Sequence, residues 1–369
     1  MKRDNNNVTE LASSRMTVDG RDKCRTDATS WSDGVVKTAI KKSVRSGNKQ
    51  KREKNKRSVL RTDVTPEVDL TVKVGAATFK NPFVAASGTY GFGREAAEFL
   101  DLSIWGGISS KGVTLEPRAG NPPPRVAETS CGMLNAVGLQ NPGVDAFMAN
   151  ELPFMLEQDT ITIVNVAGST EDDYEEVCRR VDASDAPIIE LNLSCPNVRT
   201  GGMTFGADPA NIESVTKRVR TLTDKQLWVK LTPNVTSIAD AARAAEAGGA
   251  DAVSLINTLL GMSIDAETRR PILHNNTGGL SGPAVKPIAL RMVNEVFRAV
   301  RIPVVGLGGI RTALDAVEFM IAGASAVQIG TFNLISPTGI EQIVRDFEIW
   351  LTAHQVKEPC ELIGTLNLW

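Results

Sequence analysis

Cysteine 195 lies in the part of the chain best suited to catalysis. The run Asn192-Leu-Ser-Cys-Pro-Asn197 follows an apolar stretch, and glycines at 201, 202 and 206 come soon after it. Glycine joints let a loop close over a site, and a thiol with a pKa of about 8.5 can serve as a general base. Only two histidines compete for that role, His274 and His354. We therefore predict that Cys195 is the catalytic base and that His274 is a surface or loop residue.

Two lysines and a set of amides are predicted to gather near this cysteine. Lys111 and Lys230 end apolar runs, so they would supply positive charge to an anionic ligand and to a reduced cofactor. Each asparagine amide offers two donors and an acceptor, which suits a flat heterocycle with alternating N–H and C=O groups. The alternative for any one asparagine is a turn. The asparagines concerned are Asn135, Asn192, Asn197 and Asn257.

Paired glycines predict a phosphate site. Gly308-Gly309 and Gly330-Thr331 follow the last two apolar runs, and we expect the loop Gly278–Gly282 to contribute. Backbone N–H groups after the last strands of a barrel commonly hold phosphate, and glycine lets the backbone approach closely. The alternative is that these pairs only make turns. Neither GxGxxG after the first strand nor GxxxxGK[ST] occurs in a fitting context, which argues against Rossmann and P-loop sites.

Eight short apolar runs alternate with amphipathic stretches, which is typical of repeated βα units and a parallel sheet. Eight such units in about 300 residues predict a (β/α)8 barrel, an α/β fold, with polar residues and glycines at all eight strand ends. A hairpin over Leu70–Lys80 is expected to cap the N-terminal end of the barrel. The predicted strands are Phe83–Ser87, Gly107–Val113, Thr160–Val166, Ile188–Leu193, Leu227–Leu231, Ala252–Ile256, Pro303–Leu307 and Ala326–Ile329. The predicted helices are Asp172–Val181, Asn211–Leu222, Ile238–Ala247, Ala284–Val300, Ala313–Ile321 and Ile340–His354.

The composition indicates a catalytic domain over residues 66–369 behind a basic extension over residues 1–65. The extension has no sustained apolar period, so we expect it to be disordered; the alternative is an arm that binds RNA or an anionic surface. A net charge of -2 for the whole chain argues against a nucleic-acid protein. Five scattered cysteines without CxxC spacing suggest reduced thiols in the cytoplasm and no metal site, and we expect Cys178 only to pack. No apolar run reaches the roughly 18 to 20 residues that span a bilayer.

These motifs resemble the dihydroorotate dehydrogenase family over about residues 68–369. The resemblance is carried by Asn192–Asn197, Asn135-Ala-Val-Gly-Leu139, Ala86-Ser-Gly-Thr89, Ser110-Lys-Gly112, Lys230 and the paired glycines. It implies one FMN per chain, bound by Ser87, Lys111, Gly112, Asn165, Asn192, Lys230, Ile256, Gly282, Gly308, Gly309, Gly330 and Thr331. It also implies a pyrimidine held by Lys111, Asn135, Ala136, Val137, Gly138, Leu139, Asn192, Asn257 and Thr258, with Cys195 as the base.

The implied reaction is the oxidation of (S)-dihydroorotate to orotate in de novo pyrimidine (UMP) biosynthesis. Cys195 would remove a proton from ring carbon 5 while a hydride passes from carbon 6 to FMN, and Lys230 would stabilise the negative charge that develops on the cofactor. The segment Asn197–Gly206 resembles the NAD-linked class, which implies a homodimer joined to a separate subunit that carries FAD and an iron–sulfur cluster. The alternatives are a fumarate-linked enzyme, a barrel of the dihydropyrimidine dehydrogenase type, and an RNA-associated protein with a degenerate barrel.

Overall fold

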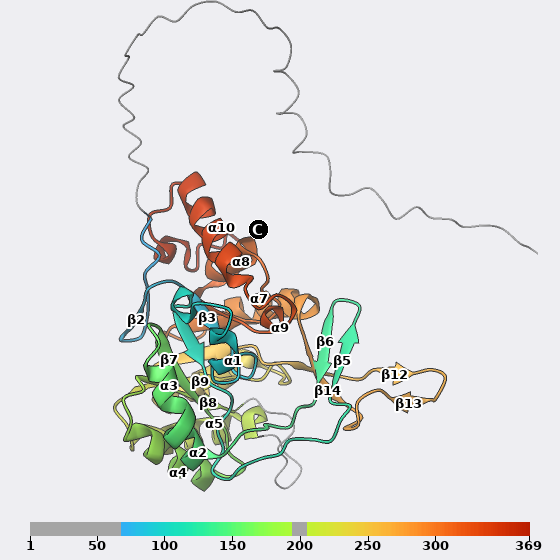
Figure 1. The fold of residues 1–369 in the computed structure, drawn as a ribbon. Coiled ribbons are helices and arrows are strands. Elements are labelled where there is room, and N and C mark those ends of the chain that lie inside the picture. The colour runs from blue at the N-terminus through green and yellow to red at the C-terminus, as the bar shows by residue number, and fades with distance from the viewer. Residues whose placement is uncertain (1–67, 194–204) are drawn as a thin grey trace, which may run out of the picture. The chain divides into compact units, whose positions relative to one another are not determined.

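Eight parallel strands close into a barrel in the computed structural model, which describes residues 68–193 and 205–369 (Figure 1). The extension expected before residue 66 and the segment with Cys195 lie outside these residues. Around the barrel the strands follow one another in chain order, so the predicted fold class is confirmed. The barrel strands are β3 (Phe83–Ala85), β4 (Gly107–Ser109), β7 (Ile161–Val166), β8 (Ile188–Asn192), β9 (Gln226–Lys230), β10 (Ala252–Leu255), β15 (Val304–Leu307) and β16 (Ala324–Ile329).

These strands form because their side chains are buried on both faces. Every residue of β8 and of β16 is buried, as expected for parallel strands that lie between a packed interior and a layer of helices. Each predicted strand matches an observed one, but the first two end two and four residues earlier than expected, and β8, β9 and β10 end one residue earlier. After β4 the Ser110 and Val113 N–H groups still donate to carbonyl oxygens of β7, but the Lys111 N–H between them donates to the Gly91 carbonyl oxygen at 2.9 Å. The regular ladder is therefore interrupted at Lys111 and Gly112, which line the cavity described below.

The helices surround the barrel, and four of the longer ones, α4, α5, α6 and α8, begin at a side-chain cap. The α4 helix starts with a capping box in which Thr170 and Asp173 bond each other's backbone N–H groups, and it buries Tyr174, Val177, Cys178 and Val181 on one face. Cys178 is thus a packing residue, as predicted. No helix of the described residues is long and apolar enough to cross a membrane. The longer helices are α4 (Glu171–Asp182), α5 (Pro209–Arg220), α6 (Ile238–Ala247), α7 (Lys286–Phe297), α8 (Ala313–Ala322) and α10 (Ile340–Ala353).

Shorter helical turns connect the main elements. The α turns are α1 (Arg94–Ala97), α2 (Val144–Ala146), α3 (Leu152–Leu156) and α9 (Thr331–Ile335). The remaining turns are the 3₁₀ segments η1 (Leu102–Ile104), η3 (Phe205–Ala207), η4 (Pro283–Val285) and η5 (Pro359–Leu362), with the π turn η2 (Phe147–Glu151). The helix predicted over Ala284–Val300 is therefore divided into η4 and α7.

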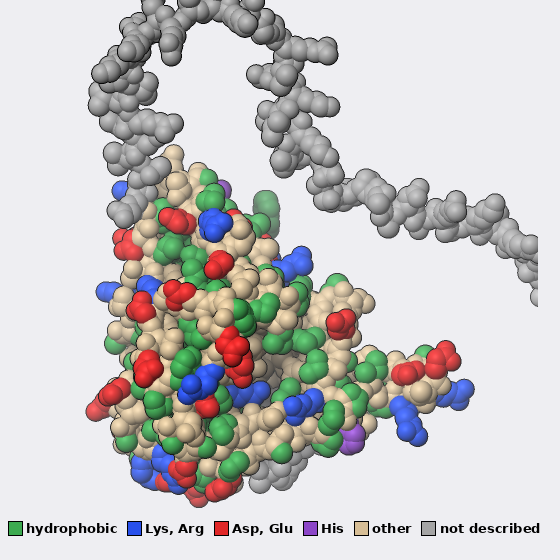
Figure 2. All heavy atoms as spheres, viewed as in Figure 1, with side chains coloured by type: hydrophobic (Ala, Val, Ile, Leu, Met, Phe, Trp, Pro, Cys, Tyr) green, Lys and Arg blue, Asp and Glu red, His purple; other side chains and the backbone are tan. Residues whose placement is uncertain are grey.

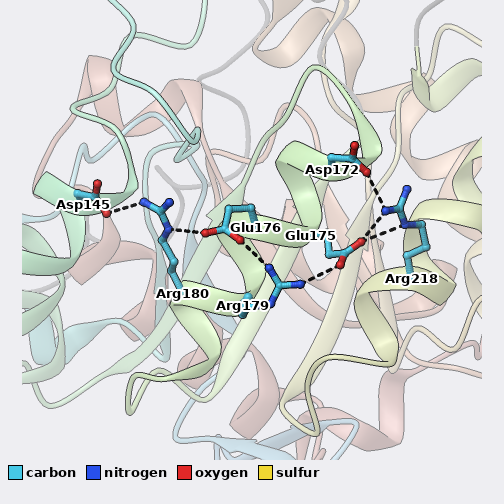
Figure 3. A network of polar contacts seen from close by, with 7 residues as sticks. All are labelled: Asp145, Asp172, Glu175, Glu176, Arg179, Arg180 and Arg218. Atoms are coloured by element: carbon cyan, nitrogen blue, oxygen red, sulfur yellow. Dashed lines mark hydrogen bonds and ion pairs between the residues drawn. The ribbon is translucent and has the colours of Figure 1, made fainter.

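A network of ion pairs on the outer surface joins three of these elements (Figure 3). Arg180 of α4 contacts Asp145 of α2 at 2.6 Å, and Arg218 of α5 contacts Glu175 of α4 at 2.6 Å. Arg179 completes the chain by contacting Glu175 and Glu176. Single exposed pairs contribute little, but a connected set with bidentate arginines can fix the register of adjacent helices. The network therefore holds consecutive βα units side by side.

The predicted N-terminal hairpin is present and lies at the start of the barrel strands. It consists of β1 (Val72–Val74) and β2 (Ala77–Phe79), which pair antiparallel around Gly75. The Phe79 ring packs 5.9 Å from that of Trp228, and the Ala76 N–H donates to the Gln226 side chain at the first residue of β9. The hairpin therefore closes the N-terminal end, opposite the end where a barrel holds its working residues.

A second sheet, which was not predicted, joins two connections of the barrel. Its order is β11-β14-β6-β5, with all pairs antiparallel. β5 (Val126–Thr129) and β6 (Gly132–Asn135) lie between β4 and β7, whereas β11 (Leu259–Gly261) and β14 (Gly278–Ser281) lie between β10 and β15. Since β4 and β10 are four strands apart in the closed barrel, the sheet links opposite sides of its mouth. A two-stranded arm, β12 (Ile264–Asp265) with β13 (Arg270–Pro271), projects beyond it (Figure 1).

Candidate active site

A cavity of about 340 Å³ lies at the C-terminal ends of the barrel strands. Its walls come from residues that follow or end β3, β4, β8, β9, β10, β15 and β16, together with strands of the second sheet. The surface is hollowed between the barrel and that sheet (Figure 2). This is the end of the barrel at which the sequence placed its polar residues and glycines.

Most of the residues proposed from the sequence line this cavity. Those predicted to contact a cofactor are Ser87, Lys111, Gly112, Asn192, Lys230, Ile256, Gly282, Gly308, Gly309, Gly330 and Thr331. Those predicted to contact a pyrimidine are Lys111, Asn135, Val137, Gly138, Leu139, Asn192, Asn257 and Thr258. Two predicted residues are not in the wall: Asn165 and Ala136 are both fully buried behind it. Cys195 and Asn197 lie outside the described residues.

Positive charge dominates the described wall of the cavity. Lys111, Lys230 and Arg311 line it, and no aspartate or glutamate does so among the lining residues that the structure describes. Burial lowers the pKa of Lys230, and the nearby Glu190 carboxylate opposes that effect. Burial also lowers the pKa of Lys111, and the positive charge of Arg125 adds to it. A cavity of this charge favours anionic ligands such as phosphate and carboxylate.

Lys230 is buried, and its ammonium group has no partner among the residues that the structure describes. The residue is 4% exposed, and none of the described side chains or carbonyl groups accepts a hydrogen bond from its Nζ. A buried charge normally requires a hydrogen-bonded partner, because desolvation is costly. The Lys230 Nζ is therefore suited to donate to a ligand that enters the cavity.

The fully buried carboxylate of Glu190 lies inside the barrel. One of its oxygens accepts hydrogen bonds from the Ser109 hydroxyl at 3.1 Å and the Asn165 amide at 2.7 Å. The other accepts from the Ser254 hydroxyl at 2.7 Å and the Gln328 amide at 2.8 Å. These donors come from four other strands, so one carboxylate joins β4, β7, β10 and β16 to β8.

Asn192 is held at the end of β8 from two sides. Its amide Nδ2 donates to the Asn165 side-chain oxygen at 3.1 Å, and its carbonyl oxygen accepts from the Tyr174 hydroxyl at 2.8 Å. Asn165 therefore acts on the cavity through Asn192 and does not reach it directly. This arrangement gives Asn192 a fixed orientation beside the segment that contains Cys195.

Three backbone N–H groups form a glycine-lined part of the wall. In the described residues, no acceptor is found for the N–H groups of Gly308, Gly309 and Gly330. Gly309 adopts φ 81°, and a Cβ there would lie 2.8 Å from the Gly282 carbonyl oxygen and from the Lys286 Cβ. Only glycine fits this position. The unpaired N–H groups suit an anionic oxygen such as a phosphate.

The prediction that residues 278–282 form a loop was wrong for most of this segment. The segment from Gly278 was expected to be a loop, but Gly278–Ser281 is strand β14, paired with β6 and β11. The physical reason is that Gly279 lets the strand pass close to Thr258, whose Oγ1 would lie 1.9 Å from a Cβ at that position. Gly282 follows the strand and still reaches the cavity.

Sequence reasoning missed three residues of the site. Glu190 and Gln328 stand within apolar strands, where a charged or amide side chain is rare and is buried only with hydrogen-bond partners. The presence of a polar side chain inside an apolar strand could therefore have identified Glu190 and Gln328 from the sequence. Arg311 follows the predicted glycine pair, but it resembles an ordinary exposed arginine in the sequence.

Comparisons with known proteins agree with this geometry. The family model described as dihydroorotate dehydrogenase matches residues 69–351. The dihydroorotate dehydrogenase B (NAD(+)) catalytic subunit of Thermoanaerobacter pseudethanolicus is 52% identical over 301 residues, which cover 82% of this chain and 100% of that protein. The protein of the same name from Alkaliphilus oremlandii is 51% identical over 298 residues, covering 81% of this chain and 99% of the relative.

Proposed function

The chain belongs to the dihydroorotate dehydrogenase family, and we propose that it oxidises dihydroorotate to orotate in pyrimidine biosynthesis with FMN as its cofactor. The observation that carries this proposal is the cavity at the strand ends. It combines three cationic side chains with unpaired backbone N–H groups. Dihydroorotate is a cyclic amide with a carboxylate, and FMN is a phosphorylated planar ring, so both match these groups.

The residues present fit FMN. The N–H groups of Gly308, Gly309 and Gly330, which have no acceptor in the described part of the chain, would hold the phosphate. Lys230 and Gln328 line the same cavity, and among the described residues neither the Lys230 Nζ nor the buried Gln328 side-chain oxygen has a hydrogen-bond partner, so both would meet the polar edge of the ring. A site that requires a ligand to satisfy its own buried groups is a site adapted to that ligand.

The residues of this chain perform the other parts of the reaction. Bound FMN would supply the hydride acceptor for carbon 6 of dihydroorotate. We assign Cys195 as the base that takes the proton from carbon 5, because it is three residues from Asn192 of the cavity wall and neither histidine lines the cavity. Lys111 offers positive charge to the substrate carboxylate, and Asn135 and Asn257 offer amides to the ring. Lys230 stabilises the negative charge that develops as the hydride is transferred.

The electrons are proposed to reach NAD through a second subunit with FAD and an iron–sulfur cluster, bound to a homodimer of this chain. The relatives' names specify NAD(+) and a catalytic subunit. The described residues contain no group of three or more His, Cys, Asp or Glu side chains able to hold a metal. With dihydroorotate, the purified chain should reduce artificial dyes but react poorly with NAD. Rapid NAD reduction by the chain alone would contradict this route, and a strong response to fumarate would indicate the fumarate-linked class instead.

The assignment of Cys195 is tested with Cys195→Ala. We expect the variant to keep its FMN and to lose roughly 100- to 10,000-fold in dihydroorotate oxidation, because a general base contributes about that much. Bleaching of the flavin absorption after anaerobic mixing with dihydroorotate measures the step directly. Cys131→Ala is the matched control, since Cys131 is exposed and does not line the cavity. Near wild-type bleaching by Cys195→Ala at neutral pH would refute the assignment.

A further inference from the structure

The buried Glu190 carboxylate determines how two amides are oriented. An ionised carboxylate only accepts hydrogen bonds, so each amide that contacts it must present its NH₂ group. Asn165 and Gln328 both do so, at 2.7 and 2.8 Å. The orientation of both amides therefore follows from the chemistry of Glu190.

With both NH₂ groups directed at Glu190, the oxygens of the two amides are left in different surroundings. The Asn165 oxygen is turned toward Asn192 and accepts from its amide at 3.1 Å. The Gln328 oxygen is buried and has no hydrogen-bond partner within the described residues, although Gln328 lines the cavity. A buried carbonyl oxygen without a donor destabilises the protein until a ligand supplies one. Gln328 therefore contributes to the cavity wall a fully buried acceptor that the described residues leave unsatisfied.

We propose that Gln328, oriented by Glu190, accepts a hydrogen bond from the ring N–H of bound FMN, so that Glu190 is a positioning residue for the cofactor. This inference rests on the proposed function. The oxidised isoalloxazine ring has a single N–H group, at N3, between two carbonyl groups. Gln328 supplies the acceptor for that N–H, and Lys230 supplies a donor in the same cavity. The protein thereby presents both hydrogen-bond polarities to the polar edge of the ring.

Replacement of Glu190 by glutamine changes the polarity but not the size of the side chain. One end of the new amide becomes a donor, so one contacting amide must turn over. Turning Asn165 would place its NH₂ against the Asn192 NH₂, whereas Gln328 has no other described hydrogen-bond partner. Gln328 should therefore turn and present NH₂ to the ring N–H.

The first test measures the dissociation constant of FMN from flavin-free protein by fluorescence. Glu190→Gln should weaken FMN binding roughly 10- to 100-fold, because two donors then face each other. The double variant Glu190→Gln/Gln328→Glu moves the carboxylate to position 328, where it accepts from the new glutamine and from the ring. It should recover about tenfold of the loss. A purely structural role for Glu190 predicts no such recovery.

The second test keeps Glu190 and uses an FMN analogue methylated at N3, which lacks the ring N–H. The wild-type protein should bind FMN more tightly than the analogue, and Gln328→Met should lose most of that preference. Ser109→Ala is the matched control: it also removes one donor to Glu190, but it does not line the cavity and should retain the preference for FMN. This test remains available if Glu190→Gln does not fold, which circular dichroism would reveal.

Three results would overturn the inference. They are equal FMN affinity of Glu190→Gln and wild type, a double variant no better than the single one, and an unchanged preference in Gln328→Met. Failure of the proposed function has a different signature, since it would leave wild-type protein that binds FMN but is not bleached by dihydroorotate.

Discussion

Lys230 and Glu190 show how the strands position individual charges. Lys230 is the last residue of β9 and Glu190 the middle residue of β8, each directly follows an apolar residue, and both are buried. The pKa of Lys230 is lowered because burial disfavours the ammonium form. The same burial strengthens its interaction with an anionic ligand, since the local dielectric is low. The charge of Lys230 therefore costs stability in the flavin-free protein and favours ligand binding.

Lys230→Met should reveal this cost through its pH dependence. With a lowered pKa in the folded state, the unfolded chain binds more protons between that pKa and the ordinary value of 10.5. The stability of flavin-free wild-type protein relative to the variant should therefore rise with pH in this window. Thermal melts of both proteins from neutral pH upward measure the difference. Lys217→Met, at an exposed position of α5, is the matched control for removal of a lysine.

At this scale the sequence predicted residues at strand ends better than those within strands. Lys111, Lys230 and Asn192 were identified because polar side chains at the ends of parallel strands meet at one mouth. Glu190 and Gln328 were not, because their partners are on strands distant in the sequence. The hydrogen-bonded group around Glu190 draws its members from five strands, so no short stretch of sequence indicates it.

Among the elements, α8 illustrates how a helix start supports the site. Asp315 accepts from the N–H groups of Arg311 and Thr312 at 3.0 and 2.9 Å, and it pairs with Lys286 of α7. Burial raises the pKa of Asp315, but the Lys286 ammonium and the N–H donors outweigh it and hold that pKa below its ordinary value. The carboxylate thus fixes the end of the segment that begins at Gly308.

Asp315→Asn should destabilise the protein by about 1 to 2 kcal/mol at pH 7, since a charged acceptor and a helix cap are both weakened. A lowered folded pKa means that the charged carboxylate stabilises the fold above the ordinary value of 3.8 and that this contribution is lost as pH falls through the folded pKa. The difference between wild type and variant in urea unfolding should therefore shrink in acid. Asp240→Asn, at the equivalent but exposed position of α6, should cost about 0.5 kcal/mol or less.

The main elements followed from the sequence, whereas the second sheet did not. Barrel strands and long helices have clear periodicities of burial, and all eight strands and six helices were anticipated. The strands of the second sheet have three or four residues and include Gly132, Gly261, Gly278 and Gly279. β5 pairs with the adjacent β6, and β11 pairs with β14 of the same connection, but the pair that unites the two halves joins segments more than 100 residues apart, for example Asn135 with Gly279. No local propensity indicates such a pairing.

At the scale of the whole molecule, the described fold and the family match begin at almost the same residue. The match starts at residue 69, and the described residues start at 68. Deletion of residues 1–65 should therefore leave the melting temperature within about 2 °C and the FMN content unchanged, because a segment without an apolar period buries little surface. Loss of soluble protein or of flavin on truncation would show that this segment belongs to the catalytic domain.

The second sheet also constrains how the sequence of this barrel can evolve. Its strands lie in two barrel connections on opposite sides of the mouth, and β6 of one pairs with β14 of the other. If the strands of either connection were lost, those of the other would be left with an unpaired edge, which invites association with other chains. Selection should therefore act on the two connections as a pair, so that a lineage that shortens one is expected to shorten the other.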